Sequence, residues 1–70
     1  MEFIVVRFRD SRDVFVDGMR MGKTGEKLRV EQGKHTIHLG EPHNYDPNWR
    51  RPEVRGTSSL KPMEVLFDPQ

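Results

Sequence analysis

Hydrophobic and polar residues alternate along most of this chain with a period of two. Residues 2–8 (EFIVVRF) are rich in β-branched and aromatic side chains, which favour a strand. Residues 27–30, 35–39 and 63–67 alternate in the same way. No window places apolar residues at i, i+3, i+4 and i+7 over the length of a helix. The pattern therefore predicts an all-β fold.

A hairpin is predicted around Asp17-Gly18, which lies between two short apolar segments. This dipeptide accepts the positive φ angles of a type I′ turn, and that turn closes a two-residue β-hairpin. With such a loop, Val16 faces Met19 and Val14 faces Met21. All four side chains then lie on one face of the hairpin.

A second hairpin is predicted around the turn at residues 31–34, with Val30 opposite His35 and Leu28 opposite Ile37. Residues 40–52 follow as one long irregular loop that contains three prolines. Residues 1–70 therefore form one domain, which we expect to be a small antiparallel β-sandwich of about six or seven short strands.

The parity of the strands predicts which apolar residues are buried, since each strand of a two-layer sandwich needs one apolar face. The expected core is Ile4, Val6, Phe8, Val14, Val16, Met19, Met21, Leu28, Val30, Ile37, Leu39, Met63, Val65 and Phe67. Four further apolar residues lie at the opposite parity, that is, at the strand positions that point away from the core: Phe3, Val5, Phe15 and Leu66. If these four cluster, the domain has a second apolar face, which we expect to support self-association or the binding of a protein partner.

Composition narrows the classes of function. Twelve basic and eleven acidic residues give a net charge of +1, so nucleic acid is not the expected partner. The chain has no cysteine, which excludes disulfides and thiolate metal sites. No apolar run approaches the roughly 20 residues of a membrane span, and the first residues do not resemble a signal peptide. We therefore expect no membrane span and a cytoplasmic location.

The stretch GMRMGKT, residues 18–24, ends like a phosphate-binding loop. That loop requires four residues between its two glycines, and only three intervene here. The segment after it continues as a strand, whereas a phosphate site would need a helix N-terminus. A turn is the better interpretation, and we predict no nucleotide site.

Residues that could support catalysis or bind a metal are sparse. His35 and His38 are three apart on a strand and point to opposite faces, so they cannot share an ion. His35 is expected to pack beside Ile37, and His43 with Asp46 offers only two flexible ligands. The serines have no positioned histidine, and no thiol nucleophile exists. We predict neither an enzyme nor a metal or cofactor site.

Residues 14–39 resemble the PEGA family. The segment VFVDGMRMGKT followed by LRVEQGKHTIHL is similar to the family's V-x-V-D-G-x-x-x-G-x-T hairpin and its following strand, glycine, histidine and strand. The family's namesake Pro-Glu-Gly-Ala segment is replaced by residues 10–13. The resemblance implies a small β-sandwich that serves as a binding or spacer module without catalytic residues. It also implies that Gly18 and Gly22 are turn glycines.

The strongest functional signal is in the long loop, which holds the only tryptophan and the only tyrosine beside paired arginines. Trp, Tyr and Arg most often anchor protein interfaces, and they also stack on sugars or bases. Two alternatives remain: an interaction module that binds a protein, or a module for carbohydrate or single-stranded nucleic acid. Trp49 could equally fold back onto the domain. The candidate loop contacts are Tyr45, Trp49, Arg50, Arg51 and Arg55.

Overall fold

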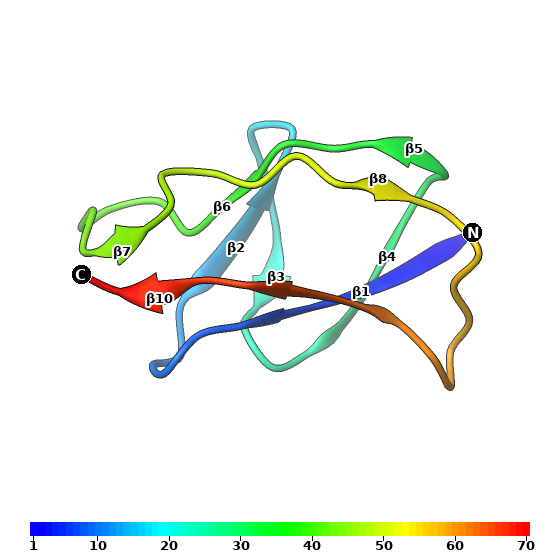
Figure 1. Cartoon of the computed structure of the whole chain (residues 1–70), viewed down its shortest axis with the longest axis horizontal. Coiled ribbons are helices and arrows are strands. Elements are labelled where there is room, and N and C mark those ends of the chain that lie inside the picture. The colour runs from blue at the N-terminus through cyan, green and yellow to red at the C-terminus, as the bar shows by residue number, and fades with distance from the viewer.

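The computed structural model describes residues 1–70 as ten short strands and no helix, which confirms the all-β prediction (Figure 1). The strands are β1 (Glu2–Arg7), β2 (Asp13–Val16), β3 (Met19–Lys23), β4 (Lys27–Val30), β5 (Gly33–Lys34), β6 (Ile37–His38), β7 (Tyr45–Asp46), β8 (Glu53–Val54), β9 (Met63–Leu66) and β10 (Asp68–Pro69). Their number exceeds the predicted six or seven because five strands are only two residues long. Such short strands show no periodic pattern in the sequence.

The strands form four small sheets, which are mostly antiparallel. Two sheets have three strands, in the orders β4-β1-β9 and β3-β2-β6, and two have two strands, β10-β7 and β5-β8. One pair is parallel: β1 lies beside β9, although the two strands are separated by most of the chain. In Figure 1 the C-terminal segment accordingly runs alongside β1 in the same direction.

The first hairpin forms as predicted at its turn. Asp17 and Gly18 have φ angles of 52° and 84°, as a type I′ turn requires. Val16 faces Met19, which is also confirmed, but Val14 faces Gly22 and not Met21. A β-bulge between these pairs leaves Met21 without a partner. Met21 is 41% exposed, and Met19 is 67% exposed although its pairing with Val16 is the predicted one, so the assignment of both methionines to the core was wrong.

Gly22 has a different role from the one that the family resemblance implied. It lies inside β3 and not at a turn. A Cβ atom at this position would lie 2.6 Å from Cδ2 of Leu28, so glycine permits β3 to approach the side chain of a core residue. The neighbouring Lys23 also lies in β3, where its Nζ donates a hydrogen bond to Asp13.

The second predicted hairpin does not form. β4 pairs with β1, with Leu28 opposite Ile4. β6 pairs with β2, and the two-residue β5 pairs with β8. The prediction failed because a strand partner distant in the sequence satisfies the same alternation as a neighbouring one. Leu28 and Ile37 are both buried all the same.

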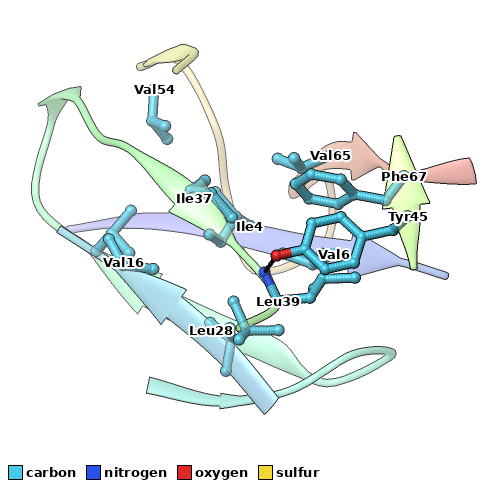
Figure 2. Close-up of a cluster of buried hydrophobic side chains, with 12 residues drawn as sticks. Ile4, Val6, Val16, Leu28, Ile37, Leu39, Tyr45, Val54, Val65 and Phe67 are labelled. Atoms are coloured by element: carbon cyan, nitrogen blue, oxygen red, sulfur yellow. Dashed lines mark hydrogen bonds between the residues drawn. The ribbon is translucent and has the colours of Figure 1, made fainter. Parts of the chain in front are cut away.

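A single core lies between the two three-stranded sheets (Figure 2). Ten of its twelve residues were predicted, and Tyr45 and Val54 were not. Phe8 and Met63 are only partly buried and pack against its side. The twelve core residues are Ile4, Val6, Val14, Val16, Leu28, Val30, Ile37, Leu39, Tyr45, Val54, Val65 and Phe67.

Candidate functional site

The first part of the long loop is held by Arg12, which immediately precedes β2. Its guanidinium donates to Asn44 Oδ1 at 2.7 Å and to the carbonyl oxygen of Pro42 at 2.6 Å. Longer hydrogen bonds reach the carbonyl oxygens of Gly40 and Leu39, at 3.3 and 3.4 Å. One side chain thus contacts four points between residues 39 and 44, and the loop is tied to the body of the domain there.

Tyr45 lies in the core, with only 2% of the residue exposed. Its hydroxyl donates to the carbonyl oxygen of Gly40 at 3.0 Å and accepts from the amide of Leu39 at 3.3 Å, as Figure 2 shows for the second bond. Its ring meets those of Phe67 and Phe8 edge to face. The prediction that Tyr45 is an exposed contact residue was therefore wrong. It had been assigned to a loop, but its backbone pairs with β10.

The second part of the loop contacts both three-stranded sheets, through its backbone at β6 and through a side chain at β9. Arg50 exchanges backbone hydrogen bonds with Ile37, at 2.7 and 2.9 Å. Its side-chain Nε donates to the carbonyl oxygen of Leu66, the last residue of β9, at 3.0 Å. The preceding Trp49 is 56% exposed and does not belong to the core cluster.

A groove of about 460 Å³ lies between this loop segment and β9. The loop contributes Arg50, Arg51 and Pro52, and β9 contributes Glu64, Val65 and Leu66. The structure thus brings together three residues that the sequence singled out for different reasons: the two arginines, from the aromatic loop, and Leu66, from the opposite parity of the last strand. Pro52, Glu64 and Val65 were not predicted as site residues.

The groove carries an excess of positive charge. Glu64 forms an ion pair with Arg7, with 3.2 Å between its Oε2 and the arginine Nη2. Neither Arg50 nor Arg51 has a carboxylate within ion-pair distance. The one acidic side chain of the groove is therefore already paired, whereas neither guanidinium group has an ion-pair partner; Arg51 acts on the Asp17 carboxylate only from beyond ion-pair distance.

The four residues of opposite parity do not form one face. Phe15 belongs to the sheet of β2, where its ring stacks on His38 at 5.0 Å. Phe3, Val5 and Leu66 belong to the sheet of β1 and β9.

These residues also differ in exposure. Val5 is only 6% exposed, so it offers little surface to a partner; Lys27, which lies opposite it on β4, donates hydrogen bonds to Ser59. Phe3 is half-buried, whereas Leu66 is 53% exposed. Arg55 is exposed but does not line the groove.

The sequence indicated that His35 packs beside Ile37 on an apolar face. In the structure its ring nitrogens instead lie close to two oxygen atoms. Its Nδ1 lies 2.7 Å from the Asp17 carboxylate, and its Nε2 lies 2.6 Å from the carbonyl oxygen of Glu31. Both ring nitrogens thus face acceptors, an arrangement that favours the protonated imidazolium. The hydrogen bond with Asp17 raises the pKa of His35 above its usual 6.5, and burial partly opposes this. The same hydrogen bond, with that from the Thr36 amide, lowers the pKa of Asp17 below 3.8.

This pair predicts a pH dependence of stability. Stabilisation through His35 is complete below pH 6.5 and is lost as the pH rises through its raised pKa. Stabilisation through Asp17 is present above pH 3.8 and is lost as the pH falls through its lowered pKa. The pair therefore stabilises the fold most between these two values. We expect His35→Gln to reduce the free energy of unfolding more at about pH 5.5 than at about pH 8.5.

Urea denaturation of both proteins at the two pH values tests this expectation. His43→Gln is the control, since His43 is exposed and forms no ion pair. An equal loss of stability at both pH values for His35→Gln would contradict the charged pair.

Comparisons of this chain with protein-family models, with curated proteins and with solved structures found no match. The resemblance to the PEGA family therefore rests on the residues of the hairpin and the following strands. The structure contains no helix that is long and apolar enough to cross a lipid bilayer.

Proposed function

We propose that this domain is a non-enzymatic protein-interaction module, and that its contact surface is the groove between residues 50–52 and β9, together with the neighbouring Trp49. The observation that carries the proposal is the convergence of two arginines without ion-pair partners and an exposed leucine on one groove. Arginine and tryptophan are the side chains that most often dominate binding energy at protein interfaces. The PEGA resemblance, which implies a binding or spacer module, agrees with this proposal.

The alternative partner classes are less well supported. A site for single-stranded nucleic acid or carbohydrate through this loop would use Tyr45 and Trp49 as stacking platforms. Tyr45 is buried, so only Trp49 of these two residues exposes an aromatic ring. The net charge of +1 also provides little attraction for a phosphate backbone. A binding assay in rising salt distinguishes these classes, because nucleic-acid binding weakens steeply with ionic strength.

The test is capture by the immobilised domain, in which the captured protein is identified, purified and measured again as a pure component. We expect the double variant Trp49→Ala and Arg51→Ala to weaken this binding by about a hundredfold, as the loss of two interface anchors predicts. Its thermal midpoint should move by only a few degrees, since both side chains are exposed.

Arg29→Ala provides the matched control. Arg29 is an exposed arginine without an ion pair, and it lies on β4, across β1 from the groove. If this control weakens binding as much as the double variant, the contact surface lies elsewhere. If neither variant weakens the binding of any purified partner, the proposed function is wrong.

A further inference from the structure

β9 is an edge strand whose outer side faces the groove. In the order β4-β1-β9 it pairs only with β1. The amide of Phe67, which directly follows β9, donates to the carbonyl oxygen of Arg7 on β1 at 3.0 Å. Because the backbone groups of successive strand residues point to alternate sides, those of Val65 also face β1. Those of Glu64 and Leu66 then face away from β1.

The side chain of Arg50 confirms this direction, since it approaches the carbonyl oxygen of Leu66 from the groove. That carbonyl is the one group on this side of β9 with a partner. No hydrogen bond outside the strand ladder is donated by the amide of Glu64 or Leu66, and none is accepted by the carbonyl oxygen of Glu64. An edge of this kind is a template for the backbone of another extended chain.

The charge of the groove indicates what that chain carries. Arg50 and Arg51 have no carboxylate within ion-pair distance, and Glu64 is paired with Arg7. When an incoming amide replaces the Nε of Arg50 at the carbonyl oxygen of Leu66, the guanidinium is free to pair with a carboxylate of the same peptide. An acidic extended segment therefore satisfies both the backbone edge and the two arginines.

A second copy of this chain fits the edge less well. If two β9 strands paired with each other, each would bring its own Arg50 and Arg51 toward the same two residues of the other copy. Four guanidinium groups would then line one small interface, and like charges in contact are destabilising. The charge thus favours a different, acidic chain over self-association through this edge.

We propose that the domain binds an acidic segment of its partner as an added strand along β9, with Arg50 and Arg51 pairing with that segment's carboxylates. This inference rests on the proposed function and specifies how the same groove is used. The four residues of β9 offer room for a peptide strand of about four residues, or roughly 13 Å. Peptide side chains alternate between the two faces, so acidic residues are expected at every second position.

The experiment compares two variants of one residue. Leu66→Ala removes the exposed side chain but keeps the amide, whereas Leu66→Pro also removes the outward-facing amide. Each protein is titrated with peptides of roughly ten residues that are selected on the wild-type domain from a random phage-displayed library. We expect the selected peptides to be acidic, and we expect Leu66→Pro to bind them about tenfold more weakly than Leu66→Ala does.

A second measurement makes the test independent of how well Leu66→Pro folds. In the wild-type complex, hydrogen exchange of the amides of Glu64 and Leu66 should slow by about tenfold or more. Unchanged exchange at both amides, selected peptides without carboxylates, or a library that yields no binder would overturn the proposal. If the exchange stays unchanged while the Trp49 and Arg51 double variant still loses its partner, the proposed function stands and the strand addition is wrong.

Discussion

Replacement of Tyr45 by alanine should lower the free energy of unfolding by about 3–5 kcal/mol, as truncation of a buried aromatic ring usually does. The ring is almost fully buried and lies edge to face with those of Phe67 and Phe8. A domain of this size has a total stability of about 4–10 kcal/mol. The variant should therefore lose about a third or more of the stability of the domain, which circular dichroism during thermal and urea denaturation would show.

Tyr45→Phe separates the contribution of the ring from that of the hydroxyl. This variant keeps the aromatic contacts but removes the partner of the Gly40 carbonyl and the Leu39 amide. We expect a loss of about 1–2 kcal/mol, since the backbone groups are left without that hydrogen bond. A loss of less than about 1 kcal/mol for Tyr45→Ala would contradict the placement of the ring in the core and return Tyr45 to the list of exposed contacts.

The alternation of apolar residues was sufficient to predict the fold class and most of the core. Ile4, Val6 and Val65 are buried at the parity expected, because that parity depends only on the period of a strand. The predicted burial of Met21 was wrong because a bulge shifts the register by one residue, and nothing in the sequence of the hairpin reveals a bulge. Val54 was missed because its strand has only two residues.

Strand pairing could not be predicted from the same pattern. The sequence places β4 next to β5, and a local hairpin satisfies the alternation as well as the observed pairing with β1 does. Only the competition among all strands for partners decides between them, and that depends on the packing of the whole core. The same limit applies to the parallel pair of β1 and β9, which are far apart in the sequence.

In the candidate site, single residues could be predicted from the sequence, but their proximity could not. Arg50 and Arg51 were predicted from residue type, and Leu66 was predicted from parity. Their meeting in one groove follows from the position of β9 as an edge strand, which the sequence does not reveal. Tyr45 shows the opposite error: an aromatic residue in an irregular segment was taken to be a surface contact, but it contributes to the core from the two-residue strand β7 within that segment.

Arg12 is the residue on which the position of that loop most depends. Its guanidinium donates to one side-chain oxygen and three carbonyl oxygens between residues 39 and 44. It also lies over the rings of Phe8 and Tyr45, at 5.8 and 5.4 Å from their centroids. A planar group with five donors can serve several acceptors at once, whereas a lysine ammonium acts as a point charge and cannot reproduce that geometry.

We therefore expect Arg12→Lys to lower the free energy of unfolding by about 2–3 kcal/mol, even though the charge is kept. With about 4–8 °C for each kcal/mol in a domain of this size, the thermal midpoint should fall by at least about 8 °C. Limited proteolysis should also cleave the variant faster near residues 40–44, because the loop loses its attachment there.

Arg9→Lys is the control for this substitution. Arg9 lies three residues earlier, is exposed, and forms a single surface ion pair with Asp10. Its replacement should change the free energy of unfolding by less than about 0.5 kcal/mol. Equal effects of the two substitutions would show that the contacts of Arg12 do not hold the loop. The groove residues Arg50 and Pro52 have attachments of their own, in the backbone hydrogen bonds to Ile37 and His35 and in the side-chain bond of Arg50 to Leu66, so they should stay in place in both variants.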